Sequence, residues 1–265
     1  MIELNPFFLE DILNENHPSD CEINSNSLIL ILKLPKIRSN NLLATSFAFV
    51  VTKERVYLYN RDKKEFEELD GVDEIYTILD GEIDNLLKEV NKIQFEIDKL
   101  EESLYEEDIK EDFMQNWLFL KKKISFIEGL VKNSYIAFEL FLKRVCTFYN
   151  KKFKKEALGD LLEHLKRVRD ISIDGILKLD NLYNFYTAVV NEKMNKNIYI
   201  ITMLSAIFMP LTLVSSFFGM NTGGLPLSND PNGTLKAVII TLILEVIFIV
   251  PIFFISRFSI KKKKV

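Results

Sequence analysis

The spacing of hydrophobic and polar positions changes twice along the chain, which divides the chain into three parts. Between about residues 23 and 60, short β-branched and aromatic runs alternate with polar connections, a pattern typical of β-strands. From Gly71 onward, apolar residues recur every three or four positions, which is the spacing of an amphipathic helix. The last part holds two long apolar runs, Asn197 to Phe218 and Leu235 to Ser256. These patterns predict an α+β fold that is mainly helical.

The predicted elements before the first apolar run ends are strands at residues 26–35, 42–51 and 55–60, then helices over 75–104, about 109–148, and 156–218. A lysine-rich cluster at residues 150–155 separates the last two helices. The third helix contains no proline before Pro210 and no strong stop signal before the membrane, so we expect a long stalk helix that continues into the membrane. Sixty helical residues extend roughly 90 Å, and a rod of that length needs partners to cover its apolar side.

Both apolar runs are long enough to cross a bilayer, whose core requires about 20 helical residues. Two spans place the two termini on the same side of the membrane. No Lys or Arg lies between Asn197 and Leu235, whereas Arg257 and the run Lys261 to Lys264 follow the second span. The positive-inside rule therefore predicts cytoplasmic termini and an external loop. The expected location is the plasma (inner) membrane, with lipid as a partner.

The predicted organisation comprises a small cytoplasmic α/β domain (1–70), a cytoplasmic helical region and stalk (71–196), a first transmembrane helix (197–218), an external loop (219–234), a second transmembrane helix (235–256) and a basic cytoplasmic tail (257–265).

The net charge of −4 conceals two blocks of opposite sign. Nineteen acids and four lysines lie between Glu65 and Asp112, whereas sixteen Lys or Arg and nine acids lie between Phe113 and Asn197. Such blocks are compatible with two helical layers that attract each other, with an acidic surface that concentrates cations, or with solvated helix faces.

Few residues offer conventional site chemistry. Cys21 and Cys146 are far apart, and His17 and His164 are isolated in the sequence, so neither a disulfide framework nor a His/Cys metal cage is predicted. The sequence has no nucleophile elbow, phosphate loop or metal-binding His pair, and Gly223-Gly224 is too short a signal for a nucleotide site. We therefore expect no enzyme, no cofactor and no nucleic-acid partner.

A line of mostly small or polar residues follows the first span and the helix before it, at alternating steps of three and four. Its members are Ser216, Thr212, Met209, Ser205, Thr202 or Ile201, Ile198, Asn195, Asn191 and, further down, Asn184. A spacing of about 3.5 residues is the seam of parallel helices. Within lipid, this seam can be ordinary packing glue, or it can line a hydrated path with Ile198, Ile201 and Met209 as apolar constrictions. The asparagines favour the path, because an amide binds the waters of a hydrated ion without trapping the ion by charge.

The stretch Ile207-Phe-Met-Pro-Leu-Thr, followed by Phe218-Gly-Met-Asn, a second span and the terminal Lys261 to Lys264, resembles the CorA-type divalent-cation channels and their zinc-transporting ZntB relatives. The resemblance implies a homopentamer with a cytoplasmic funnel. It also implies that the first span of each subunit lines a central pore and that the second span packs outside it.

The resemblance implies a selectivity collar made of Gly219, Met220 and Asn221. Magnesium dehydrates reluctantly, so a collar of amides and backbone carbonyls suits recognition of the hydrated ion. By the same resemblance, Thr212 and Asn195 mark further hydration sites and Ile198 and Ile201 form a hydrophobic gate. Asp160 falls near the regulatory cytosolic metal site of relatives, and Asn184 replaces an acidic pore ring of some relatives. In the external loop, Asp230 is the acid that remains to attract cations.

The sequence leaves the transported ion open. The loop continues as Thr222-Gly-Gly-Leu-Pro-Leu, closer to the zinc-type branch, yet it offers none of the nitrogen or sulfur ligands that zinc prefers. Our expectation is magnesium transport with cobalt or nickel tolerated, with zinc transport as the alternative. Glu245 lies in the middle of the second span and is either a neutral, hydrogen-bonded carboxyl or part of a proton-linked step. A non-conducting membrane scaffold or sensor is a further alternative.

Overall fold

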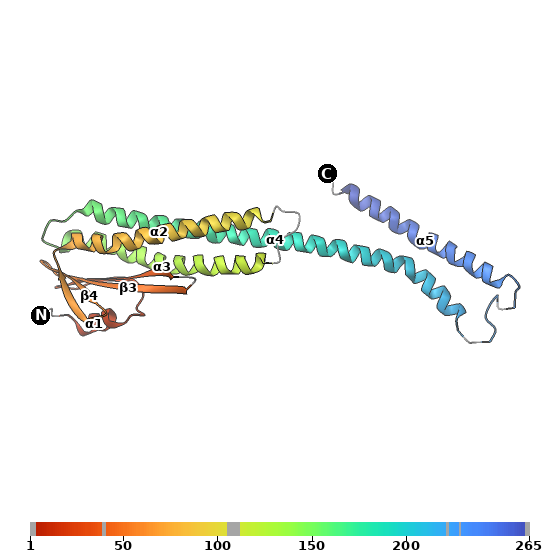
Figure 1. Cartoon of the computed structure of the whole chain (residues 1–265), viewed down its shortest axis with the longest axis horizontal. Coiled ribbons are helices and arrows are strands. Elements are labelled where there is room, and N and C mark those ends of the chain that lie inside the picture. Colours follow the sequence, from red (N-terminus) through yellow and green to blue (C-terminus); the bar gives the residue numbers. More distant parts are fainter. Residues whose placement is uncertain (1–3, 39–40, 105–111, 221–222, 228, 263–265) are drawn as a thin grey trace. The chain divides into compact units, whose positions relative to one another are not determined.

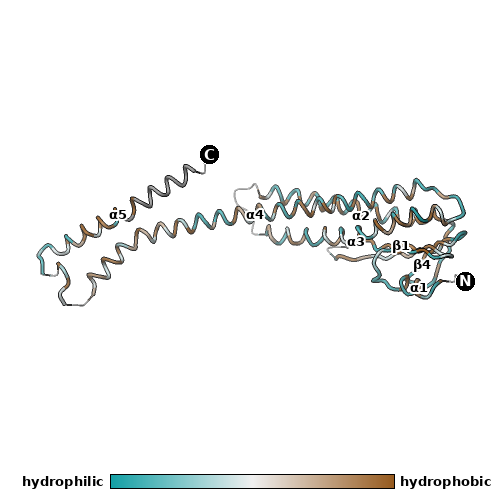
Figure 2. The backbone as a smooth tube through the Cα atoms, turned by 180° about the vertical axis from the view of Figure 1, so that it is seen from behind, coloured by the Kyte–Doolittle hydropathy of each residue, from teal (hydrophilic) through white to brown (hydrophobic). Residues whose placement is uncertain are grey.

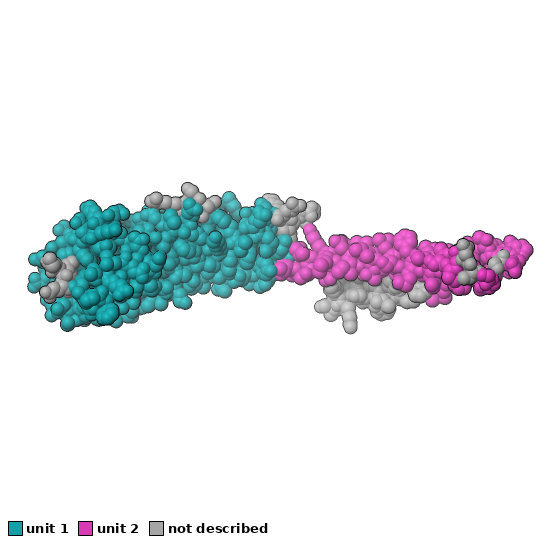
Figure 3. Space-filling view, turned by 90° about the horizontal axis from the view of Figure 1, so that it is seen from below, with its two compact units in different colours: residues 1–186 teal, residues 187–265 magenta. Residues whose placement is uncertain are grey.

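The computed structural model describes residues 4–38, 41–104, 112–220, 223–227 and 229–262. The chain divides into two compact units, unit 1 (residues 1–186) and unit 2 (residues 187–265) (Figure 3). Unit 1 combines a β-sheet with helices, as the sequence predicts. The expected boundary at residue 70 is therefore a change from strand to helix within one packed unit.

The amino-terminal part of unit 1 contains α1 (Pro6–Leu13), β1 (Asp20–Ile23), β2 (Leu28–Arg38), β3 (Asn41–Val51), β4 (Val56–Asn60) and β5 (Glu65–Leu69). The strands form one antiparallel sheet in the order β1-β2-β3-β4-β5. The three strands predicted from the sequence are confirmed as β2, β3 and β4. The prediction missed α1, β1 and β5, of which β1 is only four residues long and β5 reads Glu-Phe-Glu-Glu-Leu.

The β2 strand is apolar on both faces because the sheet is covered on both sides. Leu28, Leu30, Leu32 and Leu34 belong to the large core shared with the long helices. The alternate residues Ile29 and Ile31 pack in a second, smaller core with Ile12 of α1. The strand continues past Pro35 to Arg38, three residues beyond the prediction. Proline is tolerated there because β1 pairs only with residues 28–31, so this half of β2 is an edge.

Three long helices complete unit 1: α2 (Val72–Glu102), α3 (Phe113–Phe148) and α4 (Lys155–Phe218). Figure 1 shows them side by side, with the sheet along α3. Within unit 1, the buried positions of α4 recur at alternating steps of three and four: Leu158, Leu161, Leu165, Val168, Ser172, Gly175, Leu179 and Leu182. This is the seam of a coiled coil, and teal and brown accordingly alternate along α2 and α3 in Figure 2. The predicted long third helix is confirmed to within one residue at its start.

Unit 2 contains the carboxy-terminal part of α4, a connecting loop and α5 (Gly233–Lys262). Among the described residues, α4 is the helix that is long and apolar enough to cross a membrane by length and composition. Only 6% of its most apolar window is buried, so these apolar side chains are not the core of a soluble domain. The carboxy-terminal part of α4 therefore needs an apolar environment or partner helices.

Candidate ion pathway and its charged surroundings

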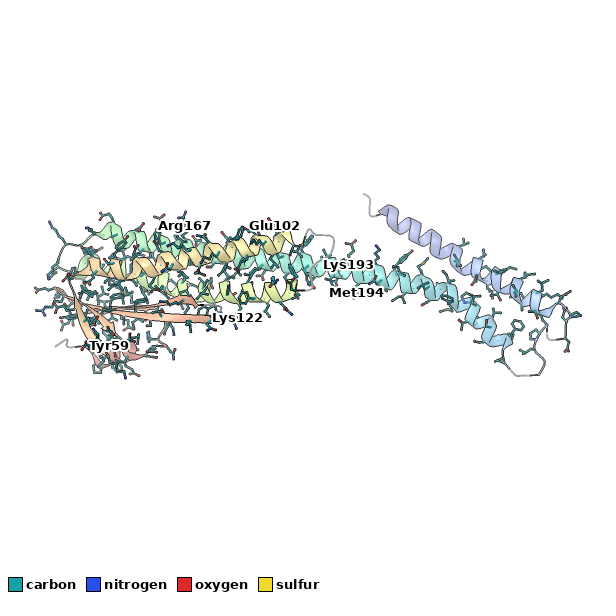
Figure 4. The ribbon with its side chains drawn as sticks, viewed as in Figure 1. Tyr59, Glu102, Lys122, Arg167, Lys193 and Met194 are labelled. Carbon is teal, nitrogen blue, oxygen red and sulfur yellow. The ribbon has the colours of Figure 1, made fainter. Side chains whose placement is uncertain are left out.

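The predicted pore-lining residues all lie on α4, and each has an exposed side chain: Asn184, Asn191, Asn195, Ile198, Ile201, Thr202, Ser205, Met209, Thr212 and Ser216. Neighbouring positions such as Lys193 and Met194 also project from α4 (Figure 4). In a single chain, exposure therefore does not single out this line. The regular spacing of its small and polar members is what defines it.

Two threonines on the line already satisfy their hydroxyl protons within the helix. Thr202 Oγ1 donates to the Ile198 carbonyl at 2.8 Å, and Thr212 Oγ1 donates to the Phe208 carbonyl at 2.7 Å. Such back-bonding keeps a polar side chain compatible with a helix in lipid. Each oxygen keeps lone pairs that can accept a hydrogen bond from water. These hydroxyls are thus suited to contact the waters around a cation.

The Gly-Met-Asn motif begins where α4 ends. The Gly219 N–H donates to the Ser215 carbonyl at 2.9 Å, and a Cβ at residue 219 would lie 2.8 Å from that same oxygen. Any other residue at this position would require the backbone to shift. Local packing therefore explains why residue 219 is a glycine. Met220 is exposed. Asn221, the predicted collar amide, lies outside the described residues.

Asp230 is engaged by its own chain. One carboxylate oxygen accepts a hydrogen bond from the Asn232 N–H at 2.8 Å, and the other pairs with the Lys236 ammonium. The hydrogen bond from Lys236 holds the pKa of the Asp230 carboxyl below its usual range. The nearby ammonium offsets the negative charge on which the predicted attraction of cations depends.

The acidic and basic blocks face each other across the helices of unit 1. Lys178 of α4 binds Asp98 and Glu101 of α2 at 2.8 and 2.5 Å, and Lys123 of α3 lies 3.9 Å from Glu96 of α2. Hydrogen bonds to the two carboxylates raise the pKa of Lys178. Among the interpretations of the charge blocks, mutual attraction of helical layers accounts for these residues. Other bases, such as Lys122 and Arg167, lie on the outside (Figure 4).

Asp160 lies in a small polar cluster between α2 and α4. The His164 ring has Nδ1 3.4 Å from Asp84 Oδ1 and Nε2 3.8 Å from Asp160 Oδ1. Nδ1 is buried but makes no well-aligned hydrogen bond. A hydrogen bond to Asp80 raises the pKa of the Tyr76 hydroxyl at the same place. Within the described ranges, no three His, Cys, Asp or Glu side chains are arranged to hold a metal ion.

His164 is isolated in the sequence, whereas the fold brings two carboxylates to it. The spacing of Asp160 and His164, four residues apart on a helix, is a signal that was available. Asp84 was not predictable in the same way, because its proximity depends on the packing of α2 against α4. On α5, Glu245 Oε1 is buried without a hydrogen-bond partner among the described residues.

Comparison with known proteins gives a consistent result. The family model described as CorA-like Mg2+ transporter protein matches residues 2–262. A cobalt/magnesium transport protein CorA of Thermotoga maritima is 24% identical over 248 residues, which cover 84% of this chain and 68% of that protein. A zinc transport protein ZntB of Vibrio parahaemolyticus is 23% identical over 146 residues, covering 51% of this chain and 42% of that protein.

The fold has a solved counterpart. The complete structure of the CorA magnesium transporter from Methanocaldococcus jannaschii superposes with a TM-score of 0.68 and 18% identity, covering 93% of this chain and 82% of that one. At this level of identity, the likeness concerns the fold.

Proposed function

The chain belongs to the CorA-like Mg2+ transporter family, and on this basis we propose that it carries divalent metal cations across a membrane through a pore lined by α4 of several copies. Members of the family are transporters rather than enzymes, which agrees with the expectation from the sequence. The observation that carries the proposal is the line of amide and hydroxyl side chains on a helix of 64 residues whose apolar portion is exposed.

The proposed membrane arrangement has two spans. The apolar part of α4 over residues 197–218 is the first, and residues 235–256 of α5 are the second. The basic tail over 257–265 supports cytoplasmic termini by the positive-inside rule. One α4 helix cannot enclose water by itself, so the pore needs several copies. A homopentamer is proposed because the CorA resemblance implies it.

Selectivity is assigned to the collar of Gly219, Met220 and Asn221 at the outer end of α4. An amide binds the water shell of Mg2+ by hydrogen bonds and leaves the inner waters in place, which suits an ion that dehydrates slowly. Because the amide carries no net charge, binding stays weak enough for release. Ile198 and Ile201 form the apolar constriction nearer the cytoplasm.

We also propose that cytosolic divalent cations regulate the pore at the cluster around Asp160. Two carboxylates, Asp84 and Asp160, flank His164. Because the described residues of one copy do not complete a metal site, the proposed cation is shared with a neighbouring copy and would bias the helices toward one arrangement. Such control is a population shift between open and closed states.

The second candidate is zinc transport, with a proton-linked step as a further possibility. The relative named as a zinc transporter and the unpartnered Glu245 Oε1 are the observations that favour it. A buried carboxyl in a span is costly when ionised, so a proton held by Glu245 is the chemistry that such coupling would use. Uptake driven by an imposed pH gradient should fall in Glu245→Gln if the step is real. Unchanged proton dependence would remove it.

The decisive experiment uses the full chain in vesicles that enclose a magnesium-sensitive or zinc-sensitive dye. We expect uptake of at least one of the two metals, and altered selectivity in Asn221→Ala. The matched control is Asn229→Ala, which removes an amide from the same loop but outside the motif. Absence of uptake for both metals would favour a non-conducting scaffold. Full and equally selective uptake in Asn221→Ala would refute the collar.

A further inference from the structure

Aromatic side chains at the start of α3 pack against the last turns of α4 within unit 1. The rings of Phe113 and Tyr186 stack with their centroids 4.6 Å apart, and the Trp117 ring lies 5.0 Å from that of Tyr183. The Trp117 Nε1 donates a hydrogen bond to the backbone carbonyl of Leu179 at 2.7 Å. We call Phe113, Trp117, Tyr183 and Tyr186 the aromatic clamp.

A charged contact reinforces the aromatic clamp one helical turn away. The Lys121 ammonium binds Asp180 Oδ1 at 2.7 Å and lies 3.4 Å from the Ile176 carbonyl. A carbonyl inside a helix normally accepts only the backbone N–H four residues further on. Here the carbonyls of Ile176 and Leu179 also accept side-chain donors from α3. These directional contacts fix the rotation of α4 about its own axis and its axial position relative to α3.

The aromatic clamp and Asn184, a member of the predicted pore line, occupy different faces of α4. At about 100° per residue, Leu179, Tyr183 and Tyr186 fall within about 60° of one another. Asn184, the member of the predicted pore line that lies in unit 1, is roughly 130° away from them on the same 3.6-residue geometry. Leu179 is fully buried and Asn184 is exposed. The contacts that bury one face of the helix therefore determine which way the other face points.

The aromatic clamp also lies at the end of unit 1, whose last residue is Tyr186. The helix itself continues without interruption to Phe218. A rotation of α4 by one residue position, about 100°, would turn Asn184 away from the axis that copies of α4 share in the proposed function.

Building on that proposed function, we propose that Trp117 is a positioning residue for conduction. The aromatic clamp holds α4 in the rotation that presents Asn184 to the pore, and loosening it shifts the balance between closed and open arrangements. The indole suits this role because its ring covers apolar surface while its N–H fixes the direction of the contact.

The test compares full-length wild type with Trp117→Phe, Trp117→Leu and Leu118→Ala in dye-loaded vesicles. Leu118 is the control, because it is the next residue of α3 and is 61% exposed. The measurement is the internal metal concentration that halves uptake. Trp117→Phe keeps a ring but loses one hydrogen bond worth about 1 kcal/mol. We therefore expect the metal concentration that halves uptake to change by about fivefold. Trp117→Leu is expected to shift it further, and Leu118→Ala to leave it unchanged.

Circular dichroism and the mass of the assembled protein separate positioning from folding. If Trp117→Leu does not assemble, Lys121→Met decides, because it removes the contacts to Asp180 and Ile176 while the aromatic rings stay. We expect this variant to shift the half-inhibiting concentration in the same direction. Variants that fold, assemble and respond to metal like wild type would overturn the inference. A wild type without uptake would instead overturn the proposed function.

Discussion

Gly175 lies where α4 packs closely against Ile124 of α3 and Ile97 of α2, and its replacement by alanine gives a sharp test of that packing. A Cβ at residue 175 would lie 2.4 Å from Ile124 Cδ1 and 3.2 Å from Ile97 Cδ1. Both isoleucines are fully buried, so neither side chain has open space into which it can swing. Gly159, on the same helix, would place a Cβ with no atom within 4 Å and is the matched control.

The two substitutions should have opposite signs. Alanine in place of glycine in a helix stabilises by roughly 0.5–1 kcal/mol, which is the whole expected effect at Gly159. At Gly175 the same gain is opposed by overpacking, which costs about 1–3 kcal/mol. The net expectation for Gly175→Ala is a loss of up to about 2 kcal/mol. At roughly 2–4 °C per kcal/mol for a unit of this size, the melting temperature should fall by several degrees.

The assay is thermal unfolding of the full-length protein in detergent, followed by circular dichroism. A third variant identifies the cause: Ile124→Val removes the methyl group that the new Cβ would strike. Alone it is expected to cost about 0.5–1.5 kcal/mol, whereas combined with Gly175→Ala it should cost less than the sum of the two. If Gly175→Ala were as stable as Gly159→Ala, or if the double variant were strictly additive, the close packing inferred at Gly175 would be refuted.

Three further predictions concern unit 1. At pH 8, a thiol reagent should label Cys146 quickly and Cys21 only after unfolding, because Cys21 is buried and burial raises its pKa to about 11; two fast thiols would contradict this. Ser134→Ala should lower the unfolding free energy by about 1–3 kcal/mol, since its buried hydroxyl joins α3 to the sheet, while Ser172→Ala, whose hydroxyl bonds only within its own helix, should cost less. Mg2+ or Zn2+ should slow proteolysis of unit 1 in wild type but less so in Asp160→Asn; indifference of wild type to both metals would remove the proposed regulation.

Local patterns were sufficient for most of the fold. Alternation and β-branched residues located β2, β3 and β4, and the recurrence of apolar residues at threes and fours located α2, α3 and α4. The missed strands depend on neighbours more than on their own residues. β5 carries three glutamates and is a strand because β4 pairs with it along its length. Residues of that kind predict a polar loop unless the partner strand is known.

The candidate site also has a part that the sequence predicts and a part that it does not. The asparagine and hydroxyl line follows from spacing alone, and the structure places every member on α4. By contrast, the aromatic clamp joins Trp117 to Leu179, 62 residues later, and the Asp84–His164 pair joins α2 to α4. Neither carries a motif, because each results from how amphipathic helices dock. The repeat in the sequence predicts the polar face of α4, whereas the contacts between helices that orient this face have no repeat to reveal them.

The uninterrupted α4 helix also constrains how the protein can change in length. Within the core seam of unit 1, a single inserted residue would turn the α4 residues that follow it out of phase by about 100°. An insertion of seven residues restores the phase to within about 20°. We therefore expect insertions and deletions in the stalk helix to be tolerated when they add or remove whole heptads.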